Sequence, residues 1–185
     1  PAKGGLPFAE YLRRQDQHRV AEIASLIDTT RFIDRAQDLY GYGNFVCDSG
    51  GSICEVVDPD NPDDPVLREL SGHLLMVWIK GSDDHTAELI RRFDRAPKPM
   101  YYQPHFLMRM WGEYLAETGG TENTVDPDAF VRWTYARALA HRQPRYAAMA
   151  KWGVTVTAEQ VAQVRDPAGV EQLIAGALES RAAQT

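Results

Sequence analysis

The sequence predicts an α/β fold in which a parallel sheet is flanked by helices and followed by a largely helical C-terminal extension. Two apolar runs, Phe45 to Cys47 and Leu74 to Ile79, lack polar alternation, which is typical of strands buried on both faces. The segment between them is long enough for a crossover helix, so we expect them to be adjacent and parallel. The sequence GVTVT at 153–157 predicts a final strand.

Helices account for most of the remaining chain. Apolar residues at helical spacing predict helices from Phe8 to about Leu26 and from Thr30 to about Tyr40. A third helix is expected after Ser82, which can serve as an N-cap, and it should end before Pro97. The pattern predicts further helices at 66–73, 104–117, 126–150, 158–164 and 166–178, and Pro144 should break or kink the helix at 126–150.

Length and composition favour one globular unit. A chain of 185 residues with 44% hydrophobic content can bury a core. We expect residues 1–99 to form an α/β core on which residues 100–185 pack as a helical extension. The net charge of -6 argues against a general nucleic-acid binder, because phosphate backbones favour a basic surface.

Membrane and redox signals point to a reduced, cytoplasmic chain. No apolar run approaches the roughly 20 residues that a membrane span needs. Cys47 and Cys54 lack the spacing of metal ligands, and no signal-like apolar stretch occurs.

The segment NFVCDSGGSICE, residues 44–55, places an acid and two glycines where the first strand is expected to end. Ligands of parallel α/β sheets bind beyond the carboxyl ends of the strands. The Asp48 carboxylate could hold a metal-bound water or accept a hydroxyl proton, and Gly50 and Gly51 would let the backbone approach a ligand. The simpler interpretation is that Asp48 caps the next helix and the glycines form a turn.

Three segments in order, NFVCDSGGSI, LLMVWIKG and HTAELIRRFDRAPKP, resemble the latter half of the P-loop kinase family, particularly its shikimate-kinase-like and nucleotide-kinase-like members. The chain is also similar to a bacterial group labelled as ATPases, through YGYGNFVCDSGGSICE and PKPMYY. The resemblance covers roughly Asn44 to Pro99, and it extends to Thr157 if GVTVT is the last strand. It implies a kinase-like core and an ATP-dependent phosphotransferase or ATPase that uses ATP and Mg²⁺.

The resemblance also implies roles for individual residues. Asp48 would be the catalytic acid near Mg²⁺ or the substrate, and the turn that binds the substrate would consist of Ser49, Gly50, Gly51 and Ser52. Cations toward the phosphates of ATP would come from Arg91, Arg92, Arg95 and Lys98, with Arg95 catalytic. Guanidinium groups suit this task because they donate hydrogen bonds in a planar fork. Taken singly, each arginine is better explained by an ordinary solvated helix face, and it is their clustering before Pro97 that favours the phosphate role.

One departure from the family is large. No G-x-x-x-x-G-K-[S/T] phosphate loop occurs in the 185 residues, and AKGGLPF near the start has no strand before its glycines. Because the chain begins at Pro1 without an initiator Met, we expect the loop to lie upstream. The alternative expectation is that nucleotide chemistry has been lost.

A second hypothesis is a non-catalytic adaptor or structural subunit that uses its aromatic helices, within residues 104–152, as a protein interface. Trp133, Tyr135 and Tyr146 are interleaved there with arginines, a mixture that could stack nucleic-acid bases. Packing of this segment on the acidic remainder of the chain is favoured, given the overall charge. The five histidines lack paired spacing, so we expect no metal site made of them.

Overall fold

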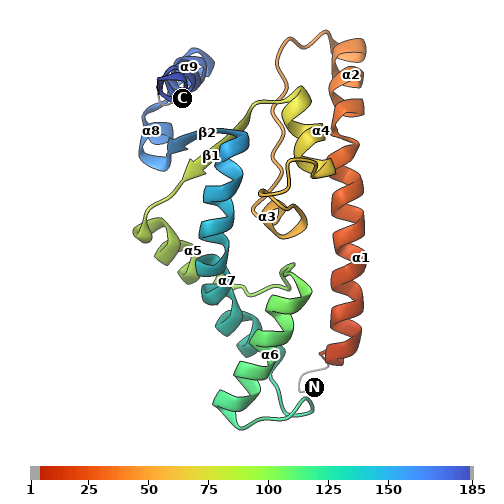
Figure 1. Cartoon of the computed structure of the whole chain (residues 1–185). Coiled ribbons are helices and arrows are strands. Elements are labelled where there is room, and N and C mark those ends of the chain that lie inside the picture. The colour runs from red at the N-terminus through yellow and green to blue at the C-terminus, as the bar shows by residue number, and fades with distance from the viewer. Residues whose placement is uncertain (1–4, 184–185) are drawn as a thin grey trace.

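The computed structural model describes residues 5–183, so the first four residues of the expected core, including the lysine of AKGGLPF, lie outside the described part. The structure is mostly helical and contains a small parallel sheet of two strands (Figure 1). A broad mixture of helix and strand was therefore predicted correctly. The elements are α1 (Phe8–Ile27), α2 (Thr29–Tyr40), α3 (Ile53–Val56), α4 (Pro65–His73), β1 (Met76–Lys80), α5 (Asp83–Arg95), α6 (Pro104–Thr118), α7 (Pro127–Met149), η2 (Ala150–Trp152), β2 (Gly153–Thr157), α8 (Ala158–Gln163) and α9 (Pro167–Ala182).

The sheet pairs β1 with β2 in parallel, from Met76 opposite Gly153 to Lys80 opposite Thr157. The strand expected at 153–157 is thus present. Gly153 is required for this pairing, because a Cβ at this position would lie 1.9 Å from the carbonyl oxygen of Met76. Within residues 5–183, each strand is paired along one edge only.

The predicted strand at Phe45–Cys47 is wrong. Residues 44–50 carry no regular secondary structure, and the Val46 side chain is 93% exposed. A short apolar run becomes a strand only where a neighbour pairs with its backbone. No described strand lies beside this run, so its apolar residues are left without the pairing that the sequence pattern suggested.

Local signals explain most helix starts. The side chains of Asp64, Asp126 and Asp166 accept hydrogen bonds from backbone N–H groups in the first turns of α4, α7 and α9, and each of these helices has a proline near its start. The sequence predicted a break or kink at Pro144, but α7 continues without a break through this residue to Met149. Side chains on the last turns of α7 are anchored to the α3 region, and these contacts hold the helix together where the proline removes a backbone hydrogen bond.

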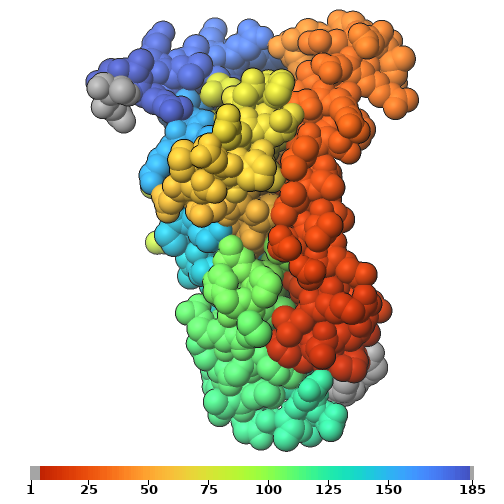
Figure 2. All heavy atoms as spheres, turned by 45° about the vertical axis from the view of Figure 1, so that its right-hand side comes forward, coloured from red at the N-terminus to blue at the C-terminus, as the bar shows by residue number. Residues whose placement is uncertain are grey.

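The core consists of two clusters of buried residues. One lies around α6 and the first half of α7 and contains the aromatic side chains of Tyr102, Phe106 and Phe130. The other joins α1, α3, α4 and the end of α7 through smaller side chains such as Leu67 and Cys54. The long helix α1 runs along one side of the molecule past both regions (Figures 1 and 2). Among the described residues, no helix combines the length and the apolar character that crossing a bilayer requires.

Candidate functional site

The Asp48–Gly51 turn is the centre of the candidate site. The Asp48 Oδ1 atom accepts a hydrogen bond from the backbone N–H of Gly50 at 2.9 Å, which closes an Asx-type turn. Gly50 has a φ of 69°, in the left-handed region where glycine is favoured. The following helix α3 has no side-chain cap, so Asp48 stabilises the turn rather than capping that helix.

A cavity of about 650 Å³ separates this turn from the sheet. Asp48, Ser49, Gly50 and Gly51 line one side, residues 76–79 of β1 line another, and the start of α5 and the last turns of α7 complete the wall. The structure therefore brings the predicted catalytic Asp48 and three of the four residues expected to bind substrate to one concave surface. Ser52 is directed elsewhere, because its hydroxyl donates a hydrogen bond at 2.6 Å to the Glu22 carboxylate on α1.

The candidate phosphate-binding arginines are not part of this cavity. Arg91 and Arg92 each lie 2.8 Å from the Glu88 carboxylate, and Arg95 lies 3.8 Å from it. All three are exposed, and their hydrogen bonds and charges, that of Arg92 first, lower the pKa of Glu88. Lys98 is exposed in the segment that follows α5. The three arginines form a solvated helix face here, which was the simpler interpretation of the sequence, and Lys98 lies beyond the helix.

Metal binding is supported by a single carboxylate only. Within residues 5–183, no group of three or more His, Cys, Asp or Glu side chains is arranged to hold a metal ion. Asp48 lies at the cavity wall, and one of its oxygens already accepts the Gly50 N–H. If Mg²⁺ binds here, its remaining ligands would be water, substrate oxygens or groups from outside the described chain.

Three α7 side chains on one helical face hold the segment that follows the turn, and the sequence pattern did not single out this role. Arg142 donates to the Glu55 carboxylate and to the Tyr101 carbonyl, both at 2.7 Å. Arg145 donates to the carbonyls of Cys54 and Val57, at 2.6 and 2.9 Å. Tyr146 donates its phenolic hydrogen to the Gly51 carbonyl at 2.5 Å.

Burial makes this contact between α7 and α3 unusual. The side chains of Arg142 and Glu55 are 3% and 0% exposed. Burial alone would lower the pKa of Arg142, but the adjacent Glu55 carboxylate outweighs it and raises the pKa. The expectation that the arginine-rich helix packs on acidic parts of the chain is confirmed here. The spacing of positions 142, 145 and 146, which share one helix face, was the available signal.

Nearby titratable groups are held in their neutral forms. Burial raises the pKa of the Cys54 thiol to about 11. Burial also lowers the pKa of His141, whose ring stacks on Phe106 with centroids 4.6 Å apart. The Nε2 atom of His141 is buried without a hydrogen-bond partner among the described residues. Both cysteines are free thiols, as the sequence predicted.

No family model, curated protein or solved structure matches this chain.

Proposed function

We propose that this chain is part of an ATP-dependent phosphotransferase or ATPase of the P-loop kinase-like class, whose phosphate loop comes from a segment outside the described residues. The observation that carries the proposal is the cavity between the Asp48–Gly51 turn and β1. One wall is the edge of β1 that has no partner strand among residues 5–183. The opposite wall includes Cys47, the end of the apolar segment Phe45–Cys47, which is also unpaired.

These two walls suit a further strand. A strand edge presents a row of unpaired N–H and C=O groups, which is a template for pairing. Val77 and Ile79 on β1 are 38% and 53% exposed, so apolar surface accompanies the free edge. Figure 1 shows the extended segment and β1 both starting near the end of the molecule where α2 and α4 lie, after which the extended segment runs down to α3 and β1 runs outward to the side where α5 lies. A parallel strand placed between them would pair with β1 and give Phe45–Cys47 a neighbour.

A phosphate loop follows directly from such a strand. In P-loop proteins the G-x-x-x-x-G-K-[S/T] loop joins the end of a strand to the start of a helix. Ligands of a parallel sheet bind beyond the carboxyl ends of its strands. The loop of the added strand would therefore reach the region where β1 ends at Lys80. The proposal includes the finer architecture expected from the sequence, a larger parallel sheet flanked by helices.

Within this proposal, Asp48 takes the role of the acid near Mg²⁺, and Ser49, Gly50 and Gly51 contact the acceptor substrate. Arg95 is proposed as a catalytic cation, and Arg91, Arg92 and Lys98 as ligands of the ATP phosphates. These four cations would have to leave Glu88 or move toward the cavity when nucleotide binds, because they lie on an exposed face in the present structure.

Calorimetry with ATP tests the proposal. The 185-residue chain should bind ATP weakly or not at all, and the longest natural polypeptide that contains it should bind ATP in a Mg²⁺-dependent manner. Within that polypeptide, Asp48→Asn should retain the fold by circular dichroism and lose most Mg²⁺-dependent turnover, because the amide keeps the turn acceptor and removes the charge. Tight ATP binding by the 185-residue chain would show that the phosphate site has been misplaced, and full turnover by the Asn variant would refute the role of Asp48.

A second candidate function is a non-catalytic adaptor, which the same exposed apolar surface favours. The aromatic side chains of α6 and α7 pack largely inside the molecule, among them Phe106, Tyr114 and Phe130. An adaptor would therefore use the edge of β1 rather than these aromatic residues. Retention of a protein partner by a longer polypeptide that shows no ATP turnover would favour this candidate.

A further inference from the structure

We propose that Tyr146 is a positioning residue that fixes the Asp48–Gly51 turn against α7 and so sets where the Asp48 carboxylate lies in the cavity. This inference rests on the proposed function for its catalytic consequence. Its structural content, that one hydroxyl holds the turn, stands independently and can be measured without any nucleotide.

The contact is made at the point where the turn joins α3. The Tyr146 hydroxyl donates to the Gly51 carbonyl at 2.5 Å, and the same carbonyl accepts the Cys54 thiol at 3.4 Å. The Tyr146 ring also packs near Trp78 on β1, with centroids 6.4 Å apart. Tyr146 therefore contacts both walls of the cavity, the turn through its hydroxyl and the sheet through its ring.

Tyr146 remains protonated and can therefore donate its hydrogen bond to the Gly51 carbonyl at all times. Burial of the phenol is the largest cause that raises its pKa, so the hydroxyl keeps its proton over the physiological range. The carbonyl of Gly51 then always has this hydrogen bond available. No titration of Tyr146 is expected to release the turn between about pH 6 and pH 9.

A side chain at Gly51 would crowd the Tyr146 hydroxyl. A Cβ at this position would lie 3.1 Å from the Tyr146 hydroxyl oxygen, which is closer than ordinary van der Waals contact. Its φ is outside the positive range, so alanine is accepted by the backbone and is opposed by the hydroxyl alone. The glycine pair of the motif thus has two separate reasons: a left-handed φ at Gly50 and close approach to Tyr146 at Gly51.

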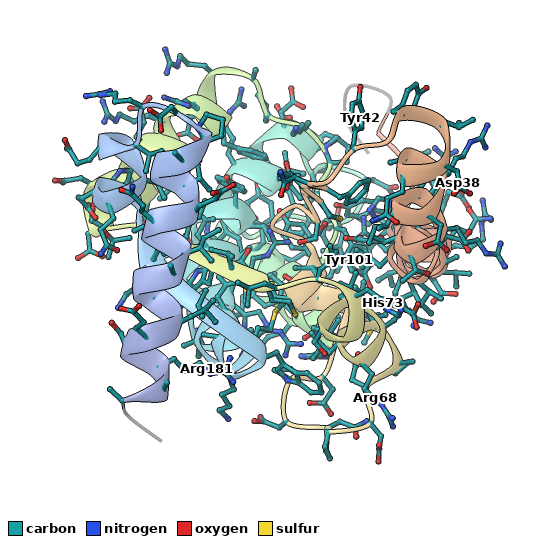
Figure 3. All side chains as sticks on the ribbon, turned by 90° about the horizontal axis from the view of Figure 1, so that it is seen from above. Asp38, Tyr42, Arg68, His73, Tyr101 and Arg181 are labelled. Carbon is teal, nitrogen blue, oxygen red and sulfur yellow. The ribbon has the colours of Figure 1, made fainter. Side chains whose placement is uncertain are left out.

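Three variants test this inference in the 185-residue chain. Tyr146→Phe should leave the global fold intact and increase amide hydrogen exchange at residues 49–52 about tenfold, because it removes one hydrogen bond from a local segment. Tyr101→Phe is the matched control: its hydroxyl is buried and has no hydrogen-bond partner within the described residues, and it lies in the interior (Figure 3). Exchange at residues 49–52 should be unchanged in that variant.

The third variant, Gly51→Ala, tests whether the Tyr146 hydroxyl and Gly51 act through the same contact. Gly51→Ala should raise exchange at the turn in the natural background and add no further increase when Tyr146 is already Phe. If the two substitutions raise the exchange rate at residues 49–52 by independent factors that multiply, the inference is wrong. It is also wrong if the turn stays fully protected from exchange in Tyr146→Phe.

The catalytic consequence is measured in the longest natural polypeptide that contains the chain. Tyr146→Phe should lower kcat for Mg²⁺-ATP about tenfold and leave KM within about twofold. If the natural protein does not turn over ATP, the proposed function is refuted. The hydrogen-exchange result then decides by itself whether Tyr146 positions the turn. If Tyr146→Phe raises exchange at residues 49–52 but leaves kcat unchanged, the link between the turn and catalysis is refuted.

Discussion

Single residues decide the contact between α7 and the α3 region. Arg142 and Glu55 form a buried ion pair, and each has a second partner: Arg142 donates to the Tyr101 carbonyl, and Glu55 accepts from the Gln103 backbone N–H at 3.3 Å. The pair thus ties α7, α3 and the start of α6 together. A buried pair of this kind costs desolvation when it forms, so its removal is costly mainly because the remaining charge is stranded.

Arg142→Met is expected to lower the free energy of unfolding by about 3–5 kcal/mol, because the Glu55 carboxylate loses its partner inside the protein. Urea unfolding followed by circular dichroism measures this change. The double variant Arg142→Met with Glu55→Gln should recover a large part of the loss, since no stranded charge remains. Arg137→Met is a suitable control because Arg137 is 42% exposed and lies 3.6 Å from Glu117, so its removal should cost less than about 1 kcal/mol. Equal losses for Arg142→Met and Arg137→Met would contradict this account.

The two cysteines should differ sharply in reactivity. Cys54 is fully buried with a pKa raised to about 11, whereas Cys47 is partly exposed and lines the cavity. Only the thiolate reacts, so at pH 8 a thiol reagent should modify Cys47 at least about tenfold faster than Cys54. Because the folded-state pKa of Cys54 lies above its ordinary value, its reactivity should rise only as the pH approaches 11. Mass spectrometry of partly labelled protein gives the order, and faster labelling of Cys54 would contradict the burial described.

At the scale of elements, the sheet depends on one glycine. β1 and β2 come from sequence positions far apart, and their pairing begins where Gly153 lies against Met76. The two strands bring residues on either side of position 99 into one sheet. A side chain at position 153 would push β2 away from β1 at the end of the sheet where both strands begin.

Gly153→Ala is expected to destabilise the protein by about 2–4 kcal/mol, because its Cβ would overlap the Met76 backbone at 1.9 Å and the strands must move apart. Gly176→Ala is the control, since a Cβ there meets no atom within 4 Å and the position is inside α9. That change should be neutral or stabilise the protein by up to about 1 kcal/mol, through helix propensity. Thermal unfolding of both variants compares them, and a neutral Gly153→Ala would mean that the strands do not approach this closely.

At the scale of the whole molecule, part of the exposed apolar surface lies along the cavity wall and along the segment that leads to it. Tyr40 and Tyr42 stack with ring centroids 5.3 Å apart and are 65% and 59% exposed, and Val46 follows them. Figure 3 places Tyr42 at the periphery, away from the interior position of Tyr101.

If a further strand fills the cavity, Cys47 is the reporter for it. Labelling of Cys47 should slow at least about tenfold in the longest natural polypeptide relative to the 185-residue chain, because a paired strand would cover the cavity wall. Labelling of Cys54 should remain slow in both. Equal Cys47 rates in the two proteins would mean that the cavity stays open and would remove the support that it gives to the added strand.

The sequence by itself determined what depends on neighbours along the chain. Aspartates before prolines start α4, α7 and α9, since capping is encoded within a few residues. The apolar runs predicted as strands at 74–79 and 153–157 correspond to β1 at Met76–Lys80 and β2 at Gly153–Thr157. The turn at Asp48–Gly51 was also predictable from its acid and glycines. Tertiary structure alone decided the rest. Phe45–Cys47 has the composition of a strand and no partner within residues 5–183, because pairing depends on what lies beside it in space. Tyr146, ninety-five positions from Gly51, holds the turn, because such a contact arises only when distant segments pack together.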